Sequence, residues 1–248
     1  MDAFIAQLRR GFFEPLLMLK RRSPKLSYWR RLESTQFLSR ERLEEIQRRR
    51  FMDMWDFLWH HNQFYRERFL DHGIRQDSVK GPGDIVKLPI ITKKEIREST
   101  ARMISAGLKK EASHHFKTGG STGKALDIYI TEACSEQRNA CARRHDRWAG
   151  WEPGEPIGAV WGNPHLPKSL KEKLFNTVVQ PYIYLDTMAL TDRSVRQFAD
   201  QWHKQRPTLL FVHAHSLYVL AQYSERIDIS RIRPRGIIST SKMLLPHE

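Results

Sequence analysis

Residues 114–131 read HHFKTGGSTGKALDIYIT, a glycine-rich loop between two strand-like segments. Apolar residues alternate along the second segment, and a period of two favours a strand over a helix. The glycines of the loop, TGGSTGK (118–124), permit positive φ, so that backbone N–H groups can converge on an anion. Ser121 and Thr122 add hydroxyl donors, and Lys124 adds a positive charge. The stretch therefore predicts a loop that grips a polyphosphate.

A Walker-type phosphate loop is a different motif, and it does not fit these residues. That motif requires glycine at the position of Thr118 and Ser or Thr at the position of Ala125. It also leads into a helix, whereas a strand is predicted here. The remaining alternative is a merely flexible Gly/Ser hairpin, which explains the glycines but not the Ser-Thr-Gly-Lys order.

Strands and helices alternate after the loop. Elements of this length imply crossovers, and hence a largely parallel sheet with helices on its faces. The predicted strands are 156–162, 182–186, 208–212 and 236–240, and the predicted helices are 131–148, 170–179, 194–205 and 216–227. The fold class is therefore α/β.

The first part of the chain is predicted to be helical. Two strongly helical stretches cover 3–20 and 39–71, and the second ends at Gly73, a favoured residue after a helix. Residues 74–92 form a turn-rich connector, and Thr92 with Glu95 makes a capping box for a short helix over 93–100. We therefore expect a helical N-terminal region over 1–92 and a nucleotide-binding α/β region over 93–248.

The charge of the chain is strongly positive. It has 248 residues, 40% of them hydrophobic, and a net charge of +14. Residues 1–50 hold 13 Lys and Arg against 6 Asp and Glu. A solvated basic surface explains this excess, as does an anionic ligand or membrane. No zinc-finger spacing or RNP-like aromatic motif is present, so we expect no specific nucleic-acid partner.

Residues 1–22 combine an apolar stripe with a basic end. The stripe recurs at helical spacing and is followed by a basic run; its members are Phe4, Ile5, Leu8, Phe12, Leu16 and Leu19, and the run is Lys20, Arg21 and Arg22. Such a pattern lies on an anionic membrane surface or packs on its own domain. Arg9 and Arg10 interrupt any signal peptide, and no apolar run is long enough to cross a bilayer.

The chain has two cysteines, Cys134 and Cys141, on one predicted helix. Two helical turns separate them by about 10 Å, which is too far for a disulfide. Cys141 and His145 alone do not supply the ligands of a structural zinc site, so we expect no metal centre. Few cysteines fit a reducing cytoplasm, where we expect the protein, with contact to the inner membrane surface as an extension of that expectation.

The motif T-G-G-S-T-G-K-x-L between two strands resembles the phosphate loop of the adenylate-forming (AMP-binding) superfamily. Within it, the chain resembles most the branch of phenylacetate–CoA ligases and CapK capsule-biosynthesis proteins. The glycine loop is the most specific feature. Supporting likenesses are NQFYRERFLDHGI (62–74), KLPIITKKEIRE (87–98), PTLLFVHAHSLYVLA (207–221) and GIISTSKMLLPHE (236–248).

The resemblance implies a ligase that couples a small carboxylic acid to ATP with Mg²⁺, forming an acyl-adenylate that a thiol, usually coenzyme A, then attacks. It also implies roles for individual residues. The implied nucleotide-binding residues are Thr118, Gly119, Gly120, Ser121, Thr122, Gly123 and Lys124, with Ser239, Thr240, Ser241 and Lys242 at the adenine; the implied acid pocket holds His213, His215 and Ser216. A link to polysaccharide biosynthesis follows from the CapK branch.

Departures from the family pattern lead to a second hypothesis. Lys242 stands where the branch commonly has glutamate, and the family's ribose-binding aspartate and C-terminal catalytic lysine have no counterpart in this chain. The catalytic groups are expected downstream of residue 248. The chain then reads as a fragment, half of a split enzyme, or a decayed relative that binds a partner or a membrane surface without catalysis. No motif identifies the acid.

Overall fold

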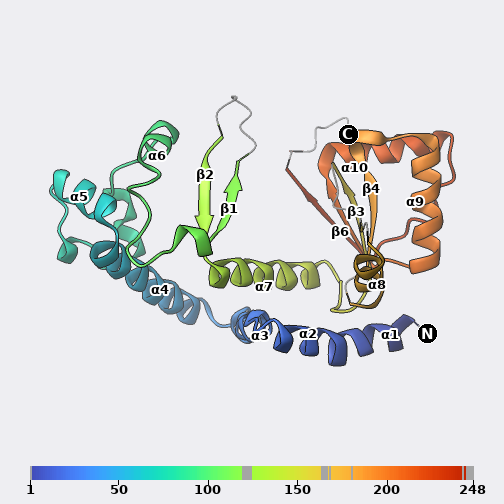
Figure 1. The fold of residues 1–248 in the computed structure, drawn as a ribbon, viewed down its shortest axis with the longest axis horizontal. Helices are drawn as coiled ribbons and strands as arrows, with labels where there is room; N and C mark the ends of the chain where they lie inside the picture. Colours follow the sequence, from blue (N-terminus) through green and yellow to red (C-terminus); the bar gives the residue numbers. More distant parts are fainter. Residues whose placement is uncertain are drawn as a thin grey trace. The chain divides into compact units, whose positions relative to one another are not determined.

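The computed structural model describes residues 2–118, 125–162, 167, 169–179, 181–241 and 243. The chain forms two compact units, one made of Met1–Trp29 and Asn139–Glu248 and the other of Arg30–Arg138. Figure 1 shows the order of the elements along the chain. The loop residues 119–124 and Lys242 lie outside the described residues.

The first unit is built on a parallel sheet. Its described strands are β3 (Ile157–Trp161), β4 (Tyr182–Asp186), β5 (Leu209–His213) and β6 (Gly236–Thr240), in the order β4-β3-β5-β6. All three pairings are parallel, with Ile157 opposite both Tyr182 and Leu209. The parallel sheet predicted from the alternating elements is therefore confirmed. The predicted strand bounds agree to within one residue.

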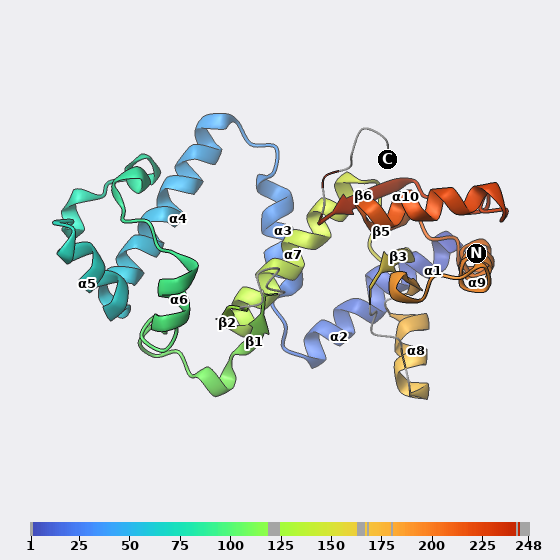
Figure 2. The same cartoon turned by 90° about the horizontal axis from the view of Figure 1, so that it is seen from above.

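Helices cover one face of this sheet. They are α9 (Asp192–Gln205) and α10 (Ala214–Gln222), and both lie next to the strands in Figures 1 and 2. Short 3₁₀ turns flank them at Thr187–Ala189 and Tyr223–Glu225, and α8 (Leu170–Val178) connects β3 to β4. Trp202 of α9 packs directly over Gly158, where a Cβ atom would lie 2.1 Å from the indole ring. Glycine is thus required for the close approach of α9 to β3.

The second unit is mainly helical. Its elements are α4 (Arg40–His61), α5 (Gln63–Asp71), α6 (Lys93–Ser99), the 3₁₀ turns Gln76–Ser78, Pro82–Lys87 and Lys110–Ala112, and the antiparallel pair β1 (His114–Lys117) and β2 (Asp127–Ile130). A small core of Trp55, Phe69, Ile74 and Val79 holds α4 and α5 together. The capping box of Thr92 with Glu95 is confirmed at the start of α6. Helix α7 (Glu132–Trp148) follows β2 and runs from this unit into the first.

The single helix expected over 39–71 is wrong, because Asn62 divides it. Its backbone is extended, with φ −127° and ψ 101°, and its side chain accepts a hydrogen bond from Tyr65 N, which caps α5. The same side chain donates to Met103 O and to Ser105 Oγ, and it is 2% exposed. These tertiary bonds outweigh the helical continuity that the sequence indicates. A further helix, α3 (Lys25–Thr35), was not predicted.

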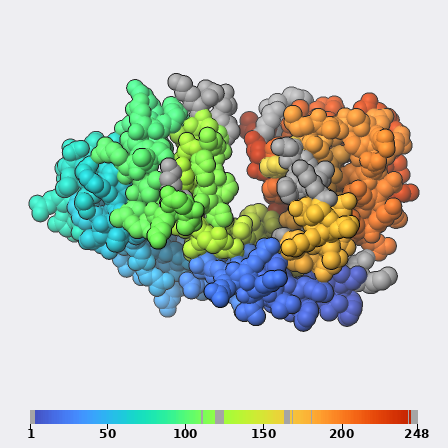
Figure 3. Space-filling view, in the orientation of Figure 1, coloured from blue at the N-terminus to red at the C-terminus, as the bar shows by residue number. Residues whose placement is uncertain are grey.

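The N-terminal segment joins the sheet unit. It consists of α1 (Asp2–Leu8), a π-helical turn at Arg9–Phe13 and α2 (Glu14–Lys20). Figure 3 shows these blue residues beside the yellow residues of α8. Residues 1–29 thus form one compact unit with residues 139–248, a division that differs from the expected helical region over 1–92 and α/β region over 93–248.

A buried ion cluster fixes this segment. Arg143 of α7 forms a two-pronged ion pair with Glu14, in which Nη2 donates to Oε2 at 2.7 Å, and Lys25 Nζ lies 3.2 Å from Glu14 Oε1. Burial acts to raise the pKa of Glu14, but the hydrogen bond and charge of Arg143, together with the charge of Lys25, hold that pKa below its ordinary value. The cluster links residues that are far apart in the chain.

We expect Glu14→Gln to lower the free energy of unfolding by about 3–5 kcal/mol at pH 7, because it leaves Arg143 buried without its charged partner. Urea denaturation followed by tryptophan fluorescence measures this. Glu45→Gln is the matched control, since Glu45 is an exposed residue that pairs only with Arg48 of the next turn among the described residues. Equal, small effects of the two substitutions would show that the cluster does not hold the fold.

The effect of Glu14→Gln should also depend on pH. The pKa of Glu14 is lowered by folding, so its contribution is complete above the unfolded-state pKa of about 4.3 and is lost as the pH falls through the lower folded-state value. The difference in unfolding free energy between the wild type and the variant should therefore shrink below about pH 4. Denaturation curves at a series of pH values test this, and a constant difference down to pH 3 contradicts it.

Candidate functional site

The carboxyl ends of the parallel strands collect polar and aromatic side chains at one edge of the sheet. In spatial order, β4, β3, β5 and β6 end at Asp186, Trp161, His213 and Thr240. Ligands of open α/β sheets bind outside this edge. The family resemblance selected two of the four residues, His213 and Thr240, and the strand register sets these two opposite each other.

Trp161 is the centre of this row. Its ring stacks on Phe211, with 5.2 Å between centroids and 20° between planes, and the ring of His213 packs edge-on against it. Side chains alternate along a strand, so Trp161, Phe211 and His213 share the face opposite the buried core of α9 and α10. All three are only half-buried. The carboxyl edge thus carries an aromatic platform on one face.

His213 presents an unsatisfied polar atom at this platform. Its Nε2 is buried and has no hydrogen-bond partner among the described residues. A buried ring nitrogen without a partner costs free energy, which a bound oxygen ligand would recover. The residue immediately precedes α10 but does not cap it with its side chain. Nε2 therefore remains available to a ligand.

The remaining predicted residues of this region lie around the platform in different ways. His215 and Ser216 lie in the first turn of α10, the former exposed and the latter half-buried. Ser239 pairs with Val212 and so faces the opposite side of the sheet from Thr240. Ser241 follows β6 with a left-handed backbone, φ 75°.

Two tyrosines of β4 border the aromatic face. Tyr182 and Tyr184 stack on each other with 5.6 Å between centroids. Burial raises the pKa of both hydroxyls, and for Tyr182 the charge of Asp146 adds to that effect. Burial also raises the pKa of Asp146, against the opposing charges of His145 and Arg143. The tyrosine hydroxyls therefore stay protonated and act as hydrogen-bonding groups rather than as bases.

The hairpin of β1 and β2 carries the glycine loop. Thr118 closes its base, since its backbone N–H donates to Leu126 O at 3.0 Å and its Oγ1 accepts from Leu126 N at 2.9 Å. The prediction that a strand, not a helix, follows the loop is confirmed by β2. Gly119, Gly120, Ser121, Thr122, Gly123 and Lys124 lie outside the described residues, as does Lys242. Thr118 belongs to the second unit, and the carboxyl edge belongs to the first.

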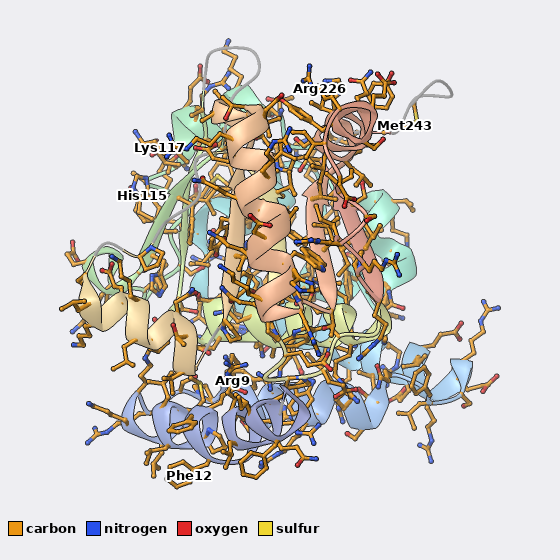
Figure 4. All side chains as sticks on the ribbon, turned by 90° about the vertical axis from the view of Figure 1, so that its right-hand side faces the viewer. Arg9, Phe12, His115, Lys117, Arg226 and Met243 are labelled. Carbon is orange, nitrogen blue, oxygen red and sulfur yellow. The ribbon has the colours of Figure 1, made fainter. Side chains whose placement is uncertain are left out.

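Exposed ion pairs tie the two strands of the hairpin together. His115 Nε2 lies 2.6 Å from Asp127 Oδ1, and Lys117 Nζ lies 3.8 Å from the same oxygen. The ring of His115 also stacks on Tyr129, with 4.8 Å between centroids. His115 and Lys117 are labelled in Figure 4. These side chains are thus engaged along the strands.

Metal-binding clusters and membrane-spanning helices are both absent from the part of the chain that the structure describes. There, no group of three or more His, Cys, Asp or Glu residues could hold a metal ion. Cys134 and Cys141 are free and exposed. No helix among the described residues is both long and apolar enough to cross a membrane.

Sequence reasoning missed Trp161 and Asp186. Both are the last residues of strands that the sequence predicts, PIGAVWG and YIYLD. In a parallel sheet, the last residue of each strand lies at the carboxyl edge, so the predicted strand ends could have marked both residues as site candidates. What the sequence does not give is the order of the strands, which sets Trp161 between Asp186 and His213.

Comparisons with known proteins agree with this architecture. Structures of 2-hydroxyisobutyryl-CoA ligase in complex with 2-HIB-AMP and CoA match at TM-scores of 0.56 and 0.54, with 17% identity, over 76% of this chain. The chain shares the fold of part of this CoA ligase. Protein CapK of Staphylococcus aureus is 24% identical over 187 residues, which is 73% of this chain. The chain spans about 40% of the length of CapK and of these ligases. No protein-family model matches the sequence.

We expect His213→Phe to leave the free energy of unfolding unchanged or to raise it by about 1–3 kcal/mol, since the ring against Trp161 is kept and the unpaired nitrogen is removed. Urea denaturation measures this, with His215→Phe as the exposed control, for which little change is expected. A loss of more than about 1 kcal/mol for His213→Phe alone would reveal a stabilising partner of Nε2.

Proposed function

We propose that this chain is the nucleotide-binding part of a ligase that activates a carboxylic acid by forming an acyl-adenylate. The observation that carries the proposal is the TGGSTGK sequence between the paired strands β1 and β2, closed at its base by Thr118 and Leu126. The likeness to CapK and to a CoA ligase solved with an acyl-AMP supports it.

The proposed reaction has two steps. The carboxylate of the acid attacks the α-phosphorus of ATP, so that an acyl–AMP anhydride forms and pyrophosphate leaves. A thiol then attacks the acyl carbon and loses its proton, which yields a thioester and AMP. The first step places growing negative charge on the leaving pyrophosphate, so donors fixed around the β- and γ-phosphates lower its barrier.

The loop would supply these donors. Ser121 and Thr122 offer hydroxyls, Gly123 a backbone N–H and Lys124 a charge. Mg²⁺ prefers phosphate oxygens and water with one or two carboxylates. We propose that Mg²⁺ binds together with ATP and neutralises part of the charge of the phosphates that the loop holds.

The carboxyl edge of the sheet is a second region to which the family resemblance assigns substrate contacts. We assign the acid to the platform of Trp161 and His213, with His215 and Ser216 at its margin, because His213 Nε2 is buried and unpaired among the described residues. An aromatic platform with one polar group suits a small acid with an apolar body. Thr240, with Ser239, Ser241 and Lys242, would contact the adenine.

The thiol and the biological setting are finer parts of the proposal. Coenzyme A is the proposed thiol, since the structurally similar ligase was solved with CoA. The resemblance to the CapK branch supports a link of the product to polysaccharide biosynthesis, and the low number of cysteines supports a reducing cytoplasm as the compartment.

The loop assignment predicts that Lys124→Ala weakens binding of ATP with Mg²⁺ by roughly 10- to 100-fold, because one charge-assisted contact of about 1.5–3 kcal/mol is lost. Isothermal titration of the chain with MgATP measures the dissociation constant. Lys117→Ala is the matched control, since it removes a lysine from the same hairpin that lies 3.8 Å from Asp127. It should change the dissociation constant by less than about threefold.

Two results would remove the proposal. The first is MgATP affinity that Lys124→Ala and Lys117→Ala reduce equally. The second is the absence of any MgATP binding by the wild-type chain when circular dichroism shows it to be folded. AMP should bind with little dependence on Lys124, because the loop is assigned to the β- and γ-phosphates.

A further inference from the structure

The N-terminal segment exposes its apolar side chains. Phe4, Leu8, Phe12, Leu16 and Leu19 are 63%, 41%, 59%, 53% and 76% exposed, and Ile5 is also exposed. They form one stripe along α1 and α2, which we call the N-terminal stripe. Its sequence pattern allowed packing on its own domain, yet of the apolar residues of this segment only Met18 is buried among the described side chains.

Polar contacts hold the opposite side of the segment against the unit. The Arg9 guanidinium donates to three backbone carbonyls, those of Gly154 at 3.0 Å, Thr177 at 2.8 Å and Val178 at 3.2 Å. Glu14 joins the buried ion cluster with Arg143. Figure 4 shows Arg9 directed toward the body of the unit and Phe12 directed away from it.

The segment therefore cannot roll to bury its stripe without breaking these bonds. The segment also approaches the backbone closely at Gly154, whose φ is 91° and whose added Cβ would lie 2.3 Å from Ala6 O. Such a close backbone approach fixes the depth of α1 against the unit. The contacts that dock the segment therefore also keep the stripe directed outward.

The π-helical turn at Arg9–Phe13 keeps the stripe straight. Phe4, Leu8, Phe12 and Leu16 are spaced four apart, and on an α-helix each such step drifts by about 40° around the axis. The wider π turn lies in the middle of this series and reduces the drift. The four side chains consequently stay on one side of the segment.

Positive charge gathers at the end of the stripe. Lys20, Arg21 and Arg22 follow Leu19; α2 ends at Lys20, and Arg22 lies just beyond the helix with a left-handed backbone, φ 52°. Lys20 and Arg22 are exposed and form no ion pair with any described residue. Aromatic and leucine side chains beside lysine and arginine fit a surface that is apolar inside and anionic outside.

We propose that the N-terminal stripe binds the surface of an anionic lipid bilayer, with Phe12, Leu16 and Leu19 entering the acyl region and Lys20 and Arg22 contacting the headgroups. A second copy of the chain is the competing occupant. The net charge of +14 opposes it, since two such chains repel, whereas the same charge attracts an anionic bilayer. The segment lies along the surface and does not cross the bilayer.

Vesicle sedimentation of the full chain tests this proposal. Wild-type protein should pellet with vesicles of phosphatidylcholine and phosphatidylglycerol at 7:3, and much less with phosphatidylcholine alone. Leu16→Glu should weaken the partitioning at least about tenfold, since it removes one apolar side chain from the acyl region and adds a negative charge. Raising NaCl from 0.1 to 0.5 M should weaken the binding of the wild type.

Leu70→Glu is the matched control. Leu70 lies on α5 and is 52% exposed, against 53% for Leu16, so the two substitutions are alike in chemistry and exposure. It should pellet like the wild type, and circular dichroism should show both variants folded. Equal loss of pelleting in both variants, or no pelleting of the wild type, would refute the proposal. A wild-type dimer in size-exclusion chromatography that Leu16→Glu dissociates, without vesicle binding, would assign the stripe to a second copy instead.

Discussion

The common direction of four strands is the constraint on which the sheet unit depends. Because β4, β3, β5 and β6 are parallel, each needs a crossover, and all four end at the same edge. Successive side chains of each strand point to opposite faces of the sheet, and the two faces have different roles. One face packs under α9 and α10, where Trp202 takes the space left by Gly158. The other face presents Trp161 and His213 at the carboxyl edge, so the same strands that form the core also build the candidate site.

Features of the fold that depend on local sequence patterns were predicted, whereas features that depend on long-range contacts were missed. The strands 182–186 and 236–240 were predicted with their observed bounds, because alternation and flanking turns are local signals. The break at Asn62 was missed because its cause lies about forty residues away, in the bonds to Met103 and Ser105. For the site, the glycine loop and His213 were available from motifs. The central position of Trp161 at the carboxyl edge follows only from the strand order, which the sequence does not give.

The N-terminal segment reverses the usual orientation of an amphipathic helix. Burying a Phe or Leu side chain contributes about 1.5–3 kcal/mol, and the exposed stripe gives up much of this gain. Arg9 and Glu14 offset it, since a hydrogen bond to a charged group contributes roughly 1.5–3 kcal/mol. Hydropathy alone favours docking through the stripe, which explains why the orientation did not follow from the sequence. Because polar contacts dock the N-terminal segment, its apolar stripe stays exposed and can contact another surface.

The positive charge of the chain would assist the proposed phosphate loop and the proposed membrane contact over different distances. A net charge of +14 attracts ATP, pyrophosphate and anionic lipid alike, but salt screens this attraction over about 8 Å at physiological ionic strength. In the proposed loop site, backbone N–H groups and Lys124 would hold a phosphate by short contacts, which salt screens less than long-range attraction. In the proposed membrane contact, Lys20 and Arg22 reach the headgroups from exposed positions, so salt screens their attraction more strongly. Raising the ionic strength should therefore weaken lipid binding more than nucleotide binding, although the same excess of lysine and arginine supports both.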